Sequence, residues 1–327
     1  MTALLGFLRL VAIVLVLATA LPAMLALFGF AVPLLDLFNH LQLIWLAGTL
    51  VGLIALLMLR ASLPWTVLAL LGLAASAFAV VPEWTSSLAA RPAPPAGVRT
   101  VTVMTHNVFG LNYDMARLAQ VIADENPDIV ALQEYFPEQV RRLDPLLKAS
   151  YPYSVRCEGG KRANLGLYSK LPFDKEMGKA DCPDDPSRQR TAHILARFVL
   201  ADGTAFSLLT THMDWPFPLD RQRSEFEAIE DVVGTVQGPL AVVGDFNSTA
   251  WSYALRGFGS AAGLTRETRS VLTYPERFTT PGGLAQTIPI LPLDQVFERG
   301  LTVSELHRGP ATGSDHRPVI FSFSVAR

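Results

Sequence analysis

The sequence predicts an α/β domain preceded by an apolar, membrane-spanning N-terminal part, and three observations support this fold class. From Arg99 onward, short buried strands alternate with amphipathic helices, which is typical of α/β proteins. Before Arg99, three apolar runs each approach the roughly 20 residues that cross a bilayer. Several predicted strands end in an ionisable or amide side chain, which indicates one polar cleft over an apolar sandwich.

The apolar runs lie at about 8–28, 41–59 and 63–81, and we interpret 1–81 as a three-helix transmembrane anchor. A cleaved signal peptide would explain only the first run. A helical hairpin buried in a soluble core would show a polar face at helical spacing, which is missing here. The anchor predicts an integral membrane protein whose bilayer contacts come from these helices.

The few charges of this region predict its orientation. Arg60 lies between the second and third runs, whereas Asp36 follows the first run and Glu83 follows the third. The positive-inside rule then places the N-terminus in the cytoplasm. Three crossings leave the remaining chain on the other side, so we expect an extracytoplasmic catalytic domain.

Residues 82–98 are rich in proline and lack apolar periodicity, which predicts a semi-extended linker before a domain spanning 99–327. Of the 27 basic and 29 acidic residues, only three and two precede Val98. The domain is therefore slightly acidic. This argues against a non-specific basic surface for nucleic acid, although a nuclease that holds its substrate through a metal remains open.

The stretch LAVVGDFNSTAW, residues 240–251, organises this domain. Leu240–Val243 is an apolar run that predicts a strand buried on both faces, and Gly244 relaxes the backbone at its end. Asp245 and Asn247 then point the same way if the extended conformation continues. A turn also uses these residue types, so the assignment depends on the rest of the chain.

Other predicted strands carry polar groups in the same way. We expect strands at 101–104, 128–133, 165–168, 193–200, 205–210, 291–297 and 318–325, and helices at 115–122, 138–148 and 220–236. The polar residues at strand ends are Asn107, Glu134, His212, Asp245 with Asn247, Asp294, and Asp315 with His316. Each alone could serve a turn, a helix start or a sheet edge; together they predict a shared cleft.

The residue types in this cleft restrict its chemistry. Carboxylates and carboxamides without a cysteine cluster favour a hard cation such as Mg²⁺ or Mn²⁺, and the histidines lack the HExxH spacing of zinc sites. The sequence contains no GxxxxGK[ST], kinase signature or GxSxG motif. Metal-dependent hydrolysis of a phosphate ester or anhydride is the function that these residues predict.

Six motifs in order, HNV, LQE, TH, GDFN, LD and GSDHRP, resemble the endonuclease/exonuclease/phosphatase superfamily from about Arg99 to the end. This superfamily includes DNase I, abasic-site endonucleases, neutral sphingomyelinases and inositol polyphosphate 5-phosphatases. The resemblance implies a four-layered sandwich of two mixed, mainly antiparallel sheets flanked by helices, with a single cleft.

The resemblance also implies site roles. Glu134 is expected to be the main metal ligand, supported by Asn107 and Asp315. Asp245 would orient or deprotonate the attacking water, and His316, held by Asp294, would stabilise or protonate the phosphoryl group. Three further residues are expected to contact phosphate oxygens: Asn247, His212 and Arg190, the last in competition with Arg188.

The substrate class follows from what accompanies these motifs. Basic loops of the kind that grip duplex DNA are missing, and three membrane spans resemble bacterial members similar to the glycopeptide-resistance protein VanJ. That resemblance implies a bacterial inner membrane and a lipid phosphate or pyrophosphate, such as an undecaprenyl carrier. A cell-surface nuclease for DNA or RNA is the alternative, followed by a non-catalytic phospholipid-binding domain. Nothing in the sequence indicates a protein partner.

Cys157 and Cys182 are the only cysteines of the chain. In an extracytoplasmic domain they could form a disulfide, and otherwise they are two unrelated thiols.

Overall fold

The computed structural model describes residues 2–94, 96–174, 182, 189–280 and 283–325. The chain divides into two compact units, which are described separately. Unit 1 comprises Met1–Ala89 together with Thr249–Gly257, and unit 2 comprises Ala90–Ser248 together with Phe258–Arg327. The segment 249–257 follows the GDFN motif directly, yet it packs with the N-terminal helices.

Unit 1 contains three long apolar helices, α1, α3 and α4, each long and apolar enough to cross a membrane. Their bounds, with those of the short helices α2 and η1 that join the first two, are α1 (Thr2–Ala26), α2 (Pro33–Asp36), η1 (Leu37–Leu41), α3 (Gln42–Met58) and α4 (Leu63–Ser87). Small residues let them pack closely, because a Cβ on Gly72 would lie 2.4 Å from the Cβ of Ala20.

The helix α4 is longer than expected. It continues through Pro82 to Ser87, so the first part of the predicted linker 82–98 is helical. A proline inside a helix removes one backbone hydrogen bond, and packing can outweigh this loss. Val80 and Glu83 on either side of Pro82 are both buried, which indicates that packing continues here.

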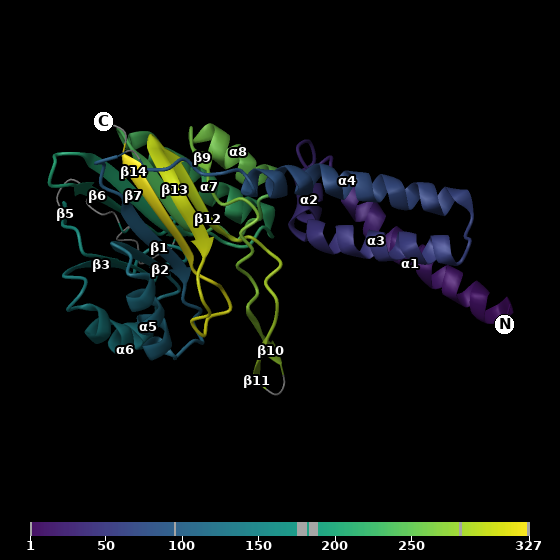
Figure 1. The fold of residues 1–327 in the computed structure, drawn as a ribbon, viewed down its shortest axis with the longest axis horizontal. Coiled ribbons are helices and arrows are strands. Elements are labelled where there is room, and N and C mark those ends of the chain that lie inside the picture. The colour runs from purple at the N-terminus through teal and green to yellow at the C-terminus, as the bar shows by residue number, and fades with distance from the viewer. Residues whose placement is uncertain (1, 95, 175–181, 183–188, 281–282, 326–327) are drawn as a thin grey trace. The chain divides into compact units, whose positions relative to one another are not determined.

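Unit 2 is built from two six-stranded sheets and a separate two-stranded hairpin (Figure 1). The first sheet has the order β13-β14-β1-β2-β4-β3. Its strands are β1 (Val101–Asn107), β2 (Ile129–Gln133), β3 (Tyr153–Cys157), β4 (Leu165–Ser169), β13 (Leu301–Arg308) and β14 (Val319–Val325).

The second sheet has the order β5-β6-β7-β8-β12-β9. Its strands are β5 (Phe173–Asp174), β6 (His193–Val199), β7 (Ala205–His212), β8 (Leu240–Asp245), β9 (Thr265–Arg266) and β12 (Asp294–Arg299). The hairpin consists of β10 (Arg277–Thr280) and β11 (Gly283–Gln286), and it extends away from both sheets in Figure 1.

One apolar core joins the inner faces of the two sheets, with Val103 and Phe321 from the first and Leu208 and Val243 from the second. Helices cover the outer faces: α5 (Met115–Glu125) and α6 (Pro137–Leu147) on the first sheet, α7 (Leu219–Thr235) on the second. Burial of these alternating apolar side chains is the main stabilising contribution. The predicted α/β sandwich with two mixed sheets is confirmed.

The two sheets share one arrangement at their centres. In each, two neighbouring strands are parallel, β1 with β2 and β7 with β8, and an antiparallel strand follows, β14 or β12. Asn107, His212 and Asp245 are the last residues of their strands, as predicted. Asp294, also expected at a strand end, is the first residue of β12 and pairs with Asp245. An antiparallel strand delivers its first residue to the edge where parallel strands end.

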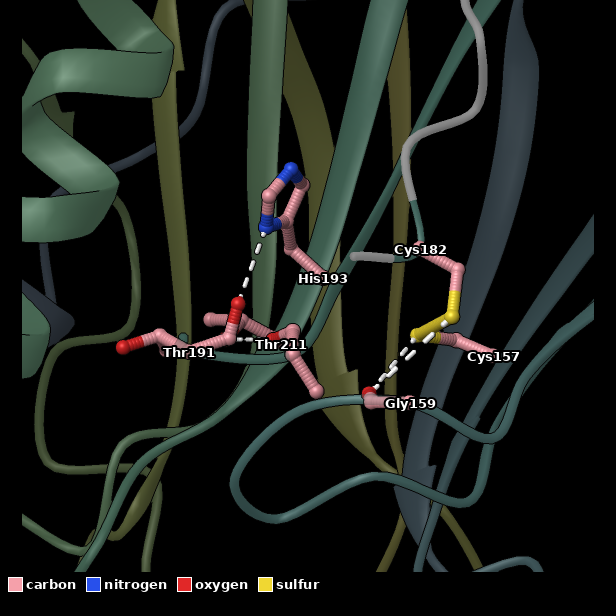
Figure 2. Close-up of a disulfide and its surroundings, with 7 residues drawn as sticks. Cys157, Gly159, Cys182, Thr191, His193 and Thr211 are labelled. Atoms are coloured by element: carbon pink, nitrogen blue, oxygen red, sulfur yellow. Dashed lines mark hydrogen bonds between the residues drawn. A yellow bond between two sulfur atoms is a disulfide. The ribbon is translucent and has the colours of Figure 1, made fainter. Parts of the chain in front are cut away.

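Several elements escaped prediction. The strands β3 and β13, the hairpin β10–β11 and the helix α8 (Tyr253–Ala261) carry charged, glycine or polar residues that interrupt a clear period. Cys157 at the end of β3 is joined to Cys182 by a disulfide (Figure 2), so the alternative of two unrelated thiols is wrong.

Candidate active site

Glu134 and Asn107 come from the two parallel strands of the first sheet. Asn107 ends β1, Glu134 follows β2, and the Asn107 amide donates to the Glu134 carboxylate at 3.4 Å. The Gly110 N–H donates to the other Glu134 oxygen at 2.9 Å. Burial opposes ionisation of Glu134, but His212, the Gly110 N–H and the Asn107 amide together lower its pKa. Glu134 is therefore a preorganised anion.

Asp245 comes from the second sheet and is 1% exposed. Its Oδ2 accepts from the Asn107 amide at 2.9 Å, and its Oδ1 accepts from the Asn247 N–H at 2.8 Å. The Nε2 atoms of His212 and His316 each lie 3.6 Å from Oδ2. Burial, with a further contribution from the Asp294 charge, raises the pKa of Asp245. Asp245 is thus oriented on both oxygens and favours holding a proton more than an exposed carboxyl does.

His316 lies between two carboxylates. Its Nδ1 is 2.8 Å from Asp294 Oδ2, which confirms the predicted contact, and its Nε2 faces Asp245. Burial alone would lower the pKa of His316, but the Asp294 and Asp245 charges raise it to about 10. The His316 N–H donates to Ser314 Oγ, which in turn donates to the Asn107 carbonyl. His316 is therefore a fixed cation at neutral pH.

Asn247 and His212 lie beside this pair. The Asn247 amide donates to the Met213 carbonyl at 2.9 Å and lies 3.3 Å from His212 Nε2. Burial lowers the pKa of His212, which favours the neutral ring. The buried Asn247 Oδ1 and His212 Nδ1 lack a hydrogen-bond partner among the described residues. Buried polar atoms of this kind are usually satisfied, so these two are available to a ligand.

The carboxylates of the site fit a divalent cation. Glu134 and Asp245 both contribute charge at Asp315, and burial together with these charges raises the pKa of Asp315 to about 6. Such crowding of carboxylates is expected where a cation neutralises them. A second group of residues has ligand atoms close enough together to hold a metal. One ligand atom from each member lies within 4.8 Å of the others, and the members are Asp245, Asp294 and His316. The metal ligands expected from the sequence, Glu134, Asn107 and Asp315, remain a prediction beside this second group.

The backbone near the metal residues and the phosphate-contacting residues is unusual. Glu134 and Asn247 have φ values of 52° and 46°, in the left-handed region that most side chains avoid. Such conformations cost on the order of 1–3 kcal/mol and cluster at functional sites. Glu134 is the first residue after β2 and Asn247 is the second after β8, so each sheet has a left-handed residue just beyond a strand end.

Two glutamines that sequence reasoning missed hold these strained loops. In the first half, Gln139 of α6 donates to the carbonyls of Phe109 and Asn112 at 2.7 and 3.0 Å. Its Oε1 accepts from the Phe136 N–H at 2.8 Å. Gln139 thus joins the loop after Asn107 to the loop after Glu134.

In the second half, Gln222 of α7 donates to the carbonyls of Asp214, Phe246 and Asn247 at 2.7, 3.1 and 3.3 Å. It is 3% exposed and joins the loop after His212 to the loop after Asp245. Both glutamines bind backbone atoms that are distant in sequence, and no local motif signals such contacts.

The cations near the site include one that the sequence did not indicate. Arg190 is exposed, and its backbone carbonyl accepts from the Lys161 N–H; nothing among the described contacts brings its guanidinium to the site. Arg188 lies outside the described residues. Arg162 is the missed cation, because its guanidinium binds Asp214 at 2.5 Å and contributes to the low pKa of His212. The role of Arg190 remains a prediction.

The pattern of the site is matched by one family model, that of the Endonuclease/Exonuclease/phosphatase family, over residues 104–316. The chain belongs to this family. Its members are hydrolases that act on phosphoester bonds, and they generally use divalent metals. The family match begins within β1 and ends at His316, in the loop before β14.

Curated relatives of the chain are UPF0294 proteins. One from Vibrio parahaemolyticus is 30% identical over 134 residues, which cover 40% of this chain and 44% of the relative. One from Vibrio cholerae is 32% identical over 133 residues, with the same coverage of 40% and 44%. The chain thus spans less than half the length of the curated relatives it matches.

Solved structures of this fold are also similar. An endonuclease/exonuclease/phosphatase from Beutenbergia cavernae has a TM-score of 0.52 and 19% identity, covering 70% of this chain and 72% of that one. A family protein from Bacteroides thetaiotaomicron has a TM-score of 0.53 and 18% identity, covering 70% and 99%. A TDP2 of D. rerio, complexed with a single-strand DNA product, has a TM-score of 0.54 and 17% identity, covering 69% and 99%. At these identities the likeness shows the fold.

Proposed function

We propose that this protein is a membrane-anchored, Mg²⁺- or Mn²⁺-dependent phosphohydrolase that cleaves a phosphate ester or pyrophosphate of a lipid-linked substrate. The observation that carries the catalytic part is the buried Asp294–His316–Asp245 arrangement beside the anionic Glu134. It provides a fixed cation, an oriented carboxylate and a cation-binding carboxylate in one place.

Each group has a separate task in the proposed reaction. Asp245 orients the attacking water and accepts its proton, because both carboxylate oxygens are already fixed by donors. His316 stabilises the negative charge that develops on the phosphoryl oxygens or protonates the leaving oxygen, and Asp294 keeps it cationic. Asn247 and His212 hydrogen-bond the substrate in this proposal, because the His212 Nε2 lies 3.6 Å from Asp245 Oδ2 and 3.3 Å from the Asn247 amide nitrogen. A bound divalent ion would neutralise phosphate charge.

The surroundings of the site support an amphiphilic substrate. Seven exposed large apolar side chains of unit 2 lie on the loops after Asn107, Glu134 and His212 or on and beside the hairpin β10–β11: Leu111, Tyr113, Phe136, Trp215, Phe217, Phe278 and Ile288. We call them the apolar rim. Phe217 is 66% and Ile288 is 80% exposed. Exposed apolar groups that gather at one place mark an interaction surface.

The apolar rim is connected to the catalytic residues through direct contacts. The Trp215 ring packs on Tyr274 at 6.0 Å, and Tyr274 packs on His316 at 4.8 Å. Near this rim, Arg162 and Arg317 are each paired with a carboxylate, Asp214 and Glu276 respectively. A surface for a nucleic-acid backbone would instead present unpaired cations, so the rim favours a lipid over DNA or RNA.

Membrane location is supported by two independent features. Helices α1, α3 and α4 have the length and composition of membrane spans. The disulfide between Cys157 and Cys182 is typical of an oxidising compartment, which agrees with a catalytic domain outside the cytoplasm. The bacterial inner membrane and the resemblance to VanJ remain predictions.

The test is phosphate release by the detergent-solubilised full chain with Mg²⁺ or Mn²⁺. Substrates are a polyprenyl pyrophosphate such as undecaprenyl pyrophosphate, phosphoinositides, sphingomyelin (scored as phosphocholine release) and plasmid DNA. We expect hydrolysis of a lipid substrate that EDTA abolishes and added Mn²⁺ restores. Nicking of the plasmid without turnover of any lipid would favour the surface nuclease instead. Lipid binding without any turnover would favour the non-catalytic domain.

A further inference from the structure

The connection between α1 and α3 carries a buried carboxylate with an unexpected set of partners. Asp36 is 6% exposed, and its oxygens accept from Ser252 Oγ at 2.9 Å, from the Tyr253 N–H at 2.9 Å and from the Ala254 N–H at 3.0 Å. These backbone groups are the first donors of α8, which the helix itself cannot satisfy. Asp36 therefore caps a helix that lies more than 200 residues away in sequence.

The cap is part of a polar cluster within unit 1. Asn39 donates to Asp36 at 2.9 Å and to the Ala26 carbonyl at 3.0 Å, and Gln42 donates to Asn39 at 2.9 Å. Gly29 allows the close approach, because a Cβ there would lie 2.8 Å from the Asp36 Cα. The cluster fixes the Asp36 side chain in front of α8.

The same connection holds the start of segment 249–257. His40 Nδ1 lies 3.3 Å from both the backbone nitrogen and Oγ1 of Thr249. The Tyr253 hydroxyl donates to the Leu27 carbonyl at 3.2 Å, and its ring packs on Phe30 at 5.9 Å. Thr249 is two residues after Asn247, so these contacts hold the chain directly behind the GDFN motif.

We propose that Asp36 is a positioning residue: by capping α8 within unit 1, it fixes segment 249–257, which continues directly from Asn247. Asn247 has a left-handed backbone that must be held from both sides. Gln222 holds it from α7, and the segment capped by Asp36 holds it from the following residues. The catalytic assignment of Asn247 rests on the proposed function; the cap itself does not.

This placement also bears on membrane topology. The connection between α1 and α3 binds a segment that belongs to the water-exposed, catalytic portion of the sequence. With three crossings, the connection after α1 and the chain after α4 lie on the same side of the bilayer. A protein in which the first run were cleaved would keep Asp36 but would lose the Ala26 and Leu27 carbonyls, which accept from the Asn39 amide and the Tyr253 hydroxyl.

The experiment compares Asp36→Ala with Asp36→Asn in the full chain, purified in detergent. Amide hydrogen exchange across 246–257 reports the cap directly, and hydrolysis of bis(p-nitrophenyl) phosphate with saturating Mn²⁺ reports positioning. We expect Asp36→Ala to speed exchange at 253–255 about tenfold and to lower kcat about tenfold with KM within about twofold of the wild type. Asp36→Asn keeps one acceptor oxygen and should recover part of both effects.

Thr49→Val is the matched control, since it removes the Thr49–Thr19 hydrogen bond between α3 and α1 without touching segment 249–257. It should leave exchange at 253–255 and kcat near the wild-type values. Unchanged exchange in a folded Asp36→Ala protein would overturn the proposal, as would an equal loss in Thr49→Val. If the wild-type chain hydrolyses no phosphate ester, the proposed function fails, and the exchange measurement alone then decides whether Asp36 holds this segment.

Discussion

The two six-stranded sheets of unit 2 follow one plan and yet supply different chemistry. Each places the ends of two parallel strands and the start of an antiparallel strand at one edge. The first sheet contributes Glu134, whose pKa is lowered although burial opposes its charge. The second contributes Asp245, whose pKa is raised by burial and by the neighbouring Asp294.

This difference suits the two carboxylates to two tasks, the binding of a cation and the transfer of a proton. Glu134 remains partly exposed and receives the Gly110 N–H, so its charge is available to a cation. Asp245 is buried beside His212 and His316, and these surroundings shift its pKa. We therefore propose that Glu134 binds the cation and that Asp245 handles the proton.

The largest effect is expected from Asp245 and His316, which come from different sheets but face each other in the site. Asp245→Asn keeps the size of the side chain but removes the charge that accepts the proton of water, and His316→Gln removes the fixed cation. Each should lower kcat by about 10²–10⁴-fold at saturating Mn²⁺. Steady-state kinetics with circular dichroism as a folding check would measure this. Turnover within threefold of the wild type in either variant would separate Asp245 or His316 from the chemistry.

The two glutamines sharpen the comparison, since one serves each half. Gln222→Leu leaves three carbonyls without their donor and should lower kcat about tenfold at saturating metal. Gln139→Leu should instead raise the Mn²⁺ concentration needed for half-maximal activity about tenfold, because it releases the loops around Glu134 and Asn107. Mn²⁺ titrations of activity distinguish the two. The same kinetic change in both variants would mean that the halves are not functionally distinct.

A smaller effect concerns stability and pH. Glu225 on α7 accepts from the Asp214 N–H, and burial raises its pKa from 4.5 to about 7. Below pH 4.5 it is protonated in both states; between pH 4.5 and 7 only the unfolded chain releases the proton, so stability falls as pH rises. The loss is at most about 3 kcal/mol.

The check is thermal unfolding of the wild type and Glu225→Gln at pH 5 and pH 8. The melting temperature of the wild type should fall more between pH 5 and pH 8 than that of Glu225→Gln, because the glutamine side chain cannot ionise. An equal loss in both proteins would show that Glu225 does not carry this pH dependence.

Much of the site could be predicted because its residues sit at the edge where strands end or begin. Asn107, His212 and Asp245 follow apolar runs directly, and that change of residue type is visible in the sequence. Gln139 and Gln222 were missed because they bind remote backbone carbonyls, which no periodicity signals. Asp36 is the extreme case.

The partners of Asp36 lie on α8. The glycines and small residues of α8 obscure its helical period in the sequence. A charge between two apolar runs reads as a topology signal, and only the fold reveals that it caps a helix. Similarly, the place of Asp294 at the start of β12 depends on strand direction, which composition does not encode.

The division of tasks between Glu134 and the Asp245–His316 pair is tested most directly by Mn²⁺ binding to the full chain, followed by electron paramagnetic resonance in the wild type, Glu134→Gln and His316→Gln. Our account predicts that Glu134→Gln weakens Mn²⁺ binding about 10–100-fold, whereas His316→Gln binds Mn²⁺ like the wild type. Loss of Mn²⁺ binding in His316→Gln with normal binding in Glu134→Gln would contradict it, and would move the metal to the buried group of Asp245, Asp294 and His316.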